Sequence, residues 1–227
     1  MTILLHSPTS DLQASLDFYL RLGFQQVLEN PLILTDGKAY IEINPDRFAR
    51  AGIKLFKESW KTEIQKIQET TALTSFDKGY LLADPSGIWI YLMEDKAPIE
   101  IATDDNCFSV LGNYAGLSLE TTDIQKSIKL YGIFGFSLSG GALEQGYISL
   151  ENNGFTISLM KPLSCPHLFF NPSMTYFNGL ENPEIIQKIK NLNIPITEEI
   201  THFNKEGIVD NIIVRDPGGF GFFVFSD

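Results

Sequence analysis

The chain has 227 residues, enough for two domains of about 110 residues each, and its hydrophobic share of 44% is ordinary for a globular protein. Its formal net charge of −11 argues against nucleic-acid backbones and anionic membrane surfaces as partners, because both need a basic face. Cys107 and Cys165 lack CxxC spacing, and no apolar run suits a signal peptide or a membrane span. We therefore expect a soluble, cytoplasmic protein with free thiols.

The first quarter of the chain predicts a βαβββ-like module. A short apolar run at Thr2–His6 indicates a strand, and Ser10 or Asp11 can cap the helix that follows. Gly23 suits the end of that helix, where positive φ is favoured. The Asp-Gly pair at 36–37 stands between two apolar runs and predicts a hairpin, because both residues tolerate positive φ.

A second module follows directly. Gly52–Phe56 is a candidate strand, and Lys61–Thr70 a candidate helix. Tyr80–Ala83 and Ile88–Met93 then form a hairpin across the Asp-Pro-Ser-Gly turn at 84–87, since proline presets φ and glycine relieves the turn. The second quarter of the chain therefore repeats the order of the first: a strand, a helix and further strands.

The least patterned stretch, residues 95–112, is expected to be a linker with one added strand at Ile99–Ala102. The third module follows, with a strand at Tyr114–Leu119, a helix from Asp123 and a hairpin across Glu151–Gly154. The fourth module is expected to consist of a strand at Thr175–Phe177, a helix at Pro183–Leu192 and closing strands at Gly207–Val214 and Phe220–Phe225.

Three segments of the first half return, in order, in the second half, and such internal repeats indicate a duplicated domain. Strands that alternate with single helices predict an α+β fold with curved, mostly antiparallel sheets. The matching pairs are SDLQASLDFYLRLGF at 10–24 with TDIQKSIKLYGIFGF at 122–136, TEIQKIQ at 62–68 with EIIQKIK at 184–190, and DPSGIWIYLMED at 84–95 with DPGGFGFFVFSD at 216–227.

Two signatures occur in both halves: an Asp before an aromatic-bearing helix that ends in Gly-Phe, and Asp-Pro-x-Gly before the last strand. Together they resemble the vicinal oxygen chelate superfamily, which includes glyoxalase I, the bleomycin-resistance proteins and the extradiol dioxygenases. The resemblance implies four βαβββ modules forming two glyoxalase-like cupped-sheet domains, at residues 1–96 and 113–227, joined by a linker at 97–112. The signature residues are Asp11, Phe18, Tyr19, Gly23, Phe24, Asp84 and Gly87, then Asp123, Tyr131, Gly135, Phe136, Asp216 and Gly219.

The same resemblance implies where a metal would bind. Metal-dependent members hold one divalent ion in the cup with His, Gln or Glu from the first and last strands of each module. The residues at the usual ligand positions are apolar, aromatic or glycine, so we predict no cofactor and assign no catalytic residue. They are Leu4, Gly116, Tyr91 and Phe223.

His6 and Glu42 leave an alternative open. His6 follows Leu4 by two positions and shares its strand face, where Glu42 could approach it. A catalytic metal normally needs three protein ligands, so a divalent-metal-dependent lyase, isomerase or dioxygenase would need further ligands. A metal-free enzyme could use Glu42 as a general base with His6 as its partner. The structural reading of His6 is a strand histidine bonded to backbone, and His167 and His202 are expected at the surface.

We predict a binding protein with an aromatic-walled pocket for an apolar or aromatic small molecule, located in the N-terminal cup. Core packing also accounts for the abundant aromatic residues. A homodimer is possible, and a protein-interaction or structural module is a further alternative. The candidate ligand-binding residues are His6, Glu42, Lys54, Tyr91, Ser158, Tyr176 and Phe223.

Overall fold

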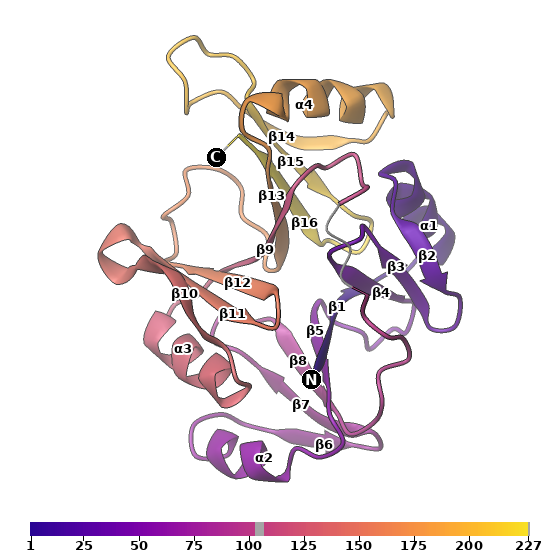
Figure 1. Cartoon of the computed structure of the whole chain (residues 1–227), viewed down its shortest axis with the longest axis vertical. Coiled ribbons are helices and arrows are strands. Elements are labelled where there is room, and N and C mark those ends of the chain that lie inside the picture. Colours follow the sequence, from indigo (N-terminus) through magenta and orange to yellow (C-terminus); the bar gives the residue numbers. More distant parts are fainter. Residues whose placement is uncertain (103–106, 227) are drawn as a thin grey trace.

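The computed structural model describes residues 1–102 and 107–226, and helices flank its strands on the outside of the molecule (Figure 1). The elements of the first half are β1 (Thr2–Pro8), α1 (Leu12–Arg21), β2 (Gln25–Leu28), β3 (Leu32–Thr35), β4 (Tyr40–Asn44), β5 (Gly52–Phe56), α2 (Lys61–Ile67), β6 (Thr74–Phe76), β7 (Gly79–Ala83) and β8 (Trp89–Met93). Those of the second half are β9 (Tyr114–Glu120), α3 (Ile124–Ile133), β10 (Ser137–Ala142), the 3-10 turn η1 (Leu143–Gln145), β11 (Tyr147–Asn152), β12 (Phe155–Met160), β13 (Ser173–Phe177), the 3-10 turn η2 (Gly179–Glu181), α4 (Asn182–Asn191), β14 (Ile196–Ile200), β15 (Asn211–Arg215) and β16 (Gly221–Phe225).

Each half forms one eight-stranded sheet with the same topology. The first sheet has the order β2-β3-β4-β1-β5-β8-β7-β6, and the second repeats it as β10-β11-β12-β9-β13-β16-β15-β14. The central strands β1 and β5 pair antiparallel, while β1–β4 and β5–β8 are parallel. The predicted α+β fold of four βαβββ modules is confirmed, and the modules pair within a half.

The helix ends follow the repeated sequence. Asp11 caps α1 by accepting a hydrogen bond from the backbone N–H of Ala14, and Asp123 caps α3 in the same way through Lys126. Such a cap satisfies one of the free N–H groups in the first helical turn. Gly23 follows α1 with φ of 88°, a left-handed conformation that glycine adopts without strain.

Two expectations about strands were wrong. Ile99–Ala102 is not a strand, and the strand predicted from Gly207 begins only at Asn211. Strands β2, β6, β10 and β14 were not predicted individually. They lie at the outer edges of the sheets, and most of their residues are exposed or half-exposed, so they lack an apolar alternation.

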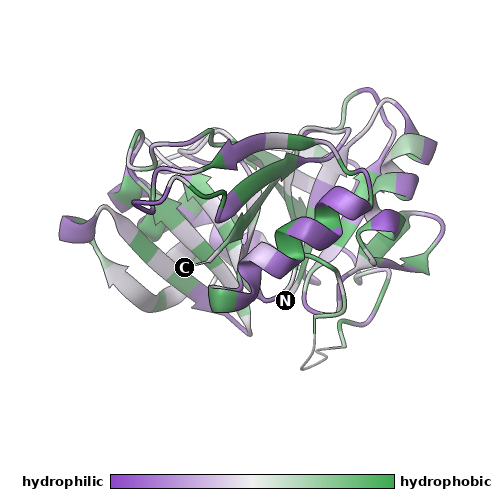
Figure 2. Ribbon diagram, turned by 90° about the horizontal axis from the view of Figure 1, so that it is seen from above, coloured by the Kyte–Doolittle hydropathy of each residue, from purple (hydrophilic) through white to green (hydrophobic). Residues whose placement is uncertain are grey.

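One hydrophobic core runs through both halves. It contains Leu5 and Ile53 of the first sheet and Leu117 and Met174 of the second, all fully buried. In Figure 2, green hydrophobic segments follow the strands, whereas purple and green alternate along the helices. Because the core is continuous, it marks no boundary between the halves, and the predicted division at residues 96 and 113 stays a prediction.

The signature residues join the halves reciprocally. Tyr19 on α1 donates a hydrogen bond of 2.9 Å to Asp216 in the last turn, and Tyr131 on α3 donates one of 2.8 Å to Asp84. Burial raises the pKa of both aspartates and, together with the neighbouring carboxylate, that of both tyrosines. Each helix tyrosine of one half thus satisfies the buried turn aspartate of the other.

Candidate functional site

Four predicted site residues lie together on the first sheet, on the face opposite its helices, which we name the N-terminal cup. His6 on β1 is the register partner of Glu42 on β4, and Lys54 on β5 is the partner of Tyr91 on β8. The Lys54 ammonium lies 2.6 Å from the Glu42 carboxylate, and the rings of His6 and Tyr91 meet edge to face with centroids 4.8 Å apart. Alternation along the strands therefore brings all four to one place.

The His6 imidazole is buried and held at both nitrogens. Nδ1 donates a 2.8 Å hydrogen bond to the carbonyl oxygen of Arg50, and Nε2 accepts one of 3.0 Å from the Asn44 amide. Burial first, and then the positive charge of Lys54, lower the pKa of His6 from 6.5 to about 3. The ring is therefore neutral at physiological pH, and both of its nitrogens are engaged.

Linker residues pack against the apolar part of the N-terminal cup. Ala97, Ile99 and Ile101 pack against an apolar cluster on this face that includes Leu4 and Tyr40. The Tyr40 hydroxyl also donates a 2.8 Å hydrogen bond to the carbonyl oxygen of Ala102. The segment predicted to add a strand instead covers the sheet with its side chains.

The donors of the N-terminal cup do not fit a divalent ion. The Lys54 ammonium is paired with Glu42 and would compete with a metal ion for this carboxylate, and both side chains are largely buried. Both nitrogens of His6 are also engaged in hydrogen bonds within the protein. Within residues 1–102 and 107–226, no three His, Cys, Asp or Glu side chains gather closely enough to hold a metal ion.

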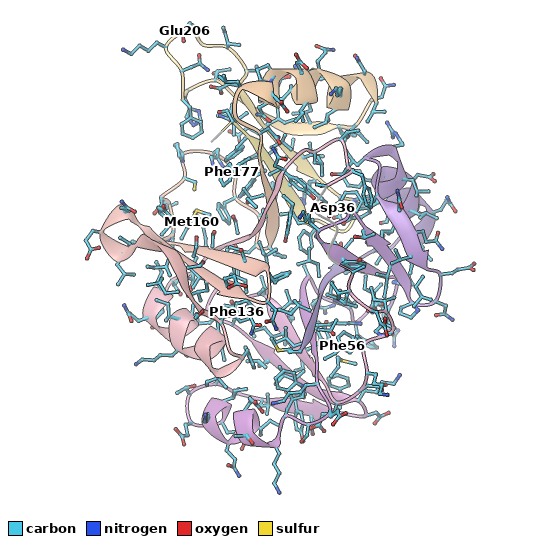
Figure 3. The ribbon with its side chains drawn as sticks, viewed as in Figure 1. Asp36, Phe56, Phe136, Met160, Phe177 and Glu206 are labelled. Carbon is cyan, nitrogen blue, oxygen red and sulfur yellow. The ribbon has the colours of Figure 1, made fainter. Side chains whose placement is uncertain are left out.

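The corresponding face of the second sheet, which we name the C-terminal cup, contains a cavity of about 450 Å³. Figure 3 labels two residues beside it, Met160 on β12 and Phe177 on β13. At its base the hydroxyls of Ser118 and Thr175 are hydrogen-bonded at 2.7 Å. The lining residues are Ser118, Met160, Ser164, Cys165, Pro166, His167, Thr175, Phe177, Phe203, Phe223 and Phe225.

The structure separates the three predicted residues of the second half. Phe223 lines the cavity, whereas Ser158 on β12 is not among the lining residues. Ser158 is the register partner of Ser118 on β9, and its hydroxyl lies 3.1 Å from that of Ser149. Tyr176 lies on the opposite face, inside the shared core, and donates a 2.7 Å hydrogen bond to Asp36 of the first half. Tyr176 therefore does not line the C-terminal cup, because its neighbours Thr175 and Phe177 take the cup-facing positions.

His167, which we expected at the surface, lies among phenylalanine rings. Its ring centroid is 5.1 Å from that of Phe225, 5.3 Å from Phe223, 6.3 Å from Phe203 and 6.4 Å from Phe169. We name these four phenylalanines the aromatic box. Sequence reasoning missed the box because two members come from loops, although Phe223 and Phe225 alternate on one strand and already indicated an aromatic face.

The C-terminal cup also does not fit a divalent ion. Its first and last strands present the hydroxyls of Ser118, Ser158 and Thr175 and the ring of Phe223, which are neutral groups. The thiol of Cys165 has a raised pKa, chiefly because of burial and then because of Glu120, so it is not a ready thiolate ligand.

No protein-family model and no curated protein matches this sequence. Solved structures do match it. The 2,3-dioxygenase LapB from Pseudomonas sp. KL28 superposes with a TM-score of 0.57 at 14% identity, over 97% of this chain and 90% of that chain. A mutant of 4-hydroxymandelate synthase from Streptomyces coelicolor gives a TM-score of 0.57 at 10% identity over 97% and 90%. The 2,2',3-trihydroxybiphenyl 1,2-dioxygenase from Sphingomonas wittichii strain RW1 gives a TM-score of 0.53 at 13% identity, over 99% of this chain and 91% of that chain.

These similarities extend along nearly the whole chain, and at such low identity they concern the fold alone. The chain has the fold of the vicinal oxygen chelate superfamily, as its two repeated signatures indicated. The reaction is a separate matter, because function depends on the residues of the site and the same scaffold carries many chemistries.

Proposed function

We propose that this protein binds a flat, apolar or aromatic small molecule in the C-terminal cup without a metal ion. The observation that carries the proposal is the aromatic-lined cavity of about 450 Å³, which lies within the range of small-molecule sites. Phe177 and Phe203 are 45% and 52% exposed, so their rings are accessible to a ligand. The Ser118 and Thr175 hydroxyls at the base supply hydrogen-bonding groups that can orient it.

This proposal moves the binding site from the N-terminal cup to the C-terminal cup. In the N-terminal cup the linker and the ion pair between Lys54 and Glu42 already occupy the positions a ligand would take. A metal-dependent enzyme built on His6 and Glu42 would have to release Lys54 and recruit further ligands. Binding without turnover needs neither change.

The free thiols support the expected cellular setting. Both cysteines are free thiols, which suits a reducing, cytoplasmic environment. None of the described helices is both long and apolar enough to cross a membrane. We include a cytoplasmic location, and a small-molecule partner, in the proposal.

Titration with the uncharged fluorescent probe N-phenyl-1-naphthylamine tests the binding site. Phe223 and Tyr91 stand at equivalent positions of the repeat, seven residues after Asp216 and Asp84. We expect Phe223→Ala to weaken probe binding about tenfold or more, because a buried ring face is lost from the cavity. Tyr91→Ala, the matched control, should leave the affinity unchanged.

The opposite pattern, with Tyr91→Ala weakening the probe and Phe223→Ala binding normally, would place the site in the N-terminal cup and refute our choice. Retention of stoichiometric metal by protein purified without chelator or affinity tag would favour the enzyme alternative instead. Circular dichroism of each variant confirms that the fold is intact before affinities are compared.

A further inference from the structure

The imidazole of His167 occupies the aromatic box as a ligand would. It stacks parallel to Phe169 at an interplanar angle of 13° and meets Phe223 and Phe225 edge to face at 73° and 83°. Edge-to-face and stacked contacts are the arrangements that aromatic pairs prefer. The box is therefore shaped around a flat nitrogen heterocycle that the chain itself supplies.

The His167 ring is weakly tied to the protein by polar contacts. Its described hydrogen bond, 2.8 Å long, runs from Nδ1 to the carbonyl oxygen of Leu168, its own neighbour in the loop. The loop is anchored elsewhere, because Glu120 accepts from the backbone N–H of Leu163 and Glu198 accepts from that of Leu168. The ring can thus leave the box without breaking a side-chain hydrogen bond to the sheet.

The charges around the box favour a neutral or cationic ring. The cavity lining contains no Lys, Arg, Asp or Glu among the described residues, and the two loop-anchoring carboxylates, Glu120 and Glu198, lie close by. Phe170 packs against the same cluster as Phe169 and Phe223, and it makes a cation–π contact with Arg215, whose Cζ lies 4.8 Å from the ring centroid. Phenylalanine faces attract cations and repel anions.

We propose that the C-terminal cup binds flat nitrogen heteroaromatic ligands that are neutral or cationic. In the absence of a ligand, the His167 imidazole occupies the ligand position in the aromatic box. This inference rests on the proposed function and adds the ligand class to it. The ligand ring takes over the contacts of the imidazole with Phe223 and Phe225, and the His167 side chain turns out of the box while its loop stays anchored by Glu120 and Glu198.

Binding of three probes to the full-length protein tests the inference by isothermal titration calorimetry. The probes are benzimidazole, the permanent cation 1,3-dimethylbenzimidazolium, and the anion 2-naphthoate as a flat ring of similar size. We expect both benzimidazoles to bind at least about tenfold more tightly than 2-naphthoate. Equal affinity for the anion would overturn the assigned ligand class.

Removing the His167 imidazole from the aromatic box gives the sharper test. We expect His167→Ala to bind benzimidazole about tenfold more tightly than the unmodified protein, because the vacated space lined by aromatic rings accepts a flat guest. Leu168→Ala, a half-exposed neighbour in the same loop, is the matched control and should leave the affinity unchanged. Phe203→Ala, at an exposed position of the box, should weaken binding without affecting the fold.

The outcomes separate the two proposals. If N-phenyl-1-naphthylamine binds and is lost in Phe223→Ala, but His167→Ala leaves benzimidazole affinity unchanged or weaker, the proposed role of His167 is overturned and the proposed function stands. If none of the probes binds either the unmodified protein or His167→Ala, both proposals fail.

Discussion

The two cups share one topology but are filled in different ways. The N-terminal cup holds its own cation, Lys54, against Glu42, and the linker packs into it through residues such as Ile99. The C-terminal cup holds neutral hydroxyls and phenylalanine rings around a cavity, with only a loop histidine among the rings. The strand register determines which side chains converge in each cup. The chemistry of those side chains decides whether the cup is filled by the protein itself or keeps a cavity for a ligand.

The largest effect should come from breaking the ion pair of the N-terminal cup. Lys54→Met leaves the Glu42 carboxylate buried without its partner, and we expect the free energy of unfolding to fall by about 3–5 kcal/mol. Urea denaturation measures the change. The matched control is Lys57→Met, because Lys57 also pairs with a glutamate but is 43% exposed, and it should cost at most about 1 kcal/mol. Equal losses in the two variants would contradict a closed polar cluster.

The contacts common to both halves should come next. Tyr19→Phe and Tyr131→Phe each remove a buried hydroxyl from an aspartate of the other half, and each should lower the free energy of unfolding by about 1.5–3 kcal/mol. The two losses should be similar because the contacts are equivalent in the repeat. Tyr147→Phe, at an exposed position, serves as the control and should change stability little.

The pH dependence of stability tests the buried histidine of the N-terminal cup, His6. The pKa of His6 is about 3 in the folded protein and about 6.5 when unfolded, so the unfolded chain takes up a proton first as the pH falls. Stability contributed by the neutral ring is present above pH 6.5 and is lost progressively towards pH 3. At pH 5 the loss should be about 2 kcal/mol.

Urea denaturation at several pH values measures this loss as the difference in the free energy of unfolding between the unmodified protein and His6→Gln. The contributions of the many carboxylates are common to both proteins and largely cancel in this difference. An unchanged profile in His6→Gln would show that the imidazole is not the group responsible.

The smallest effect should come from opening the closed cup. Ile99→Ala and Ile101→Ala each remove partly buried apolar atoms, with an expected loss of about 1–2 kcal/mol. Combined, they should add a second, weaker binding site for N-phenyl-1-naphthylamine beside the one in the C-terminal cup. A stoichiometry that stays at one would mean that the linker is not what closes this face.

Patterns that depend on local chemistry could be predicted from the sequence. The capping aspartates, the Asp-Gly hairpin and the convergence of His6, Glu42, Lys54 and Tyr91 all follow from short-range spacing and from the strand period of two. The duplicated signatures extended these predictions to the second half and indicated the fold. The same alternation also separates Tyr176 from Thr175 and Phe177, so the sequence carries the signal that places Tyr176 on the other face.

Features that depend on tertiary contacts could not be predicted from the sequence. The linker has no periodicity, so nothing in it indicated that Ile99 would face the sheet. His167 reaches the aromatic box because the distant Glu198 fixes its loop, and such a contact has no local signal. Polar edge strands were missed because they bury little.

The reciprocal contacts between Tyr19 and Asp216 and between Tyr131 and Asp84 have an evolutionary meaning. In a two-fold symmetric dimer, a residue of one copy that touches a second residue of the other must find the same contact returned. These pairs show that pattern within one chain, so a single ancestral half could have formed a homodimer through the same tyrosine and aspartate. Fusion of two such copies would make their association intramolecular and free each copy to change alone. One cup could then become closed while the other kept room for a guest.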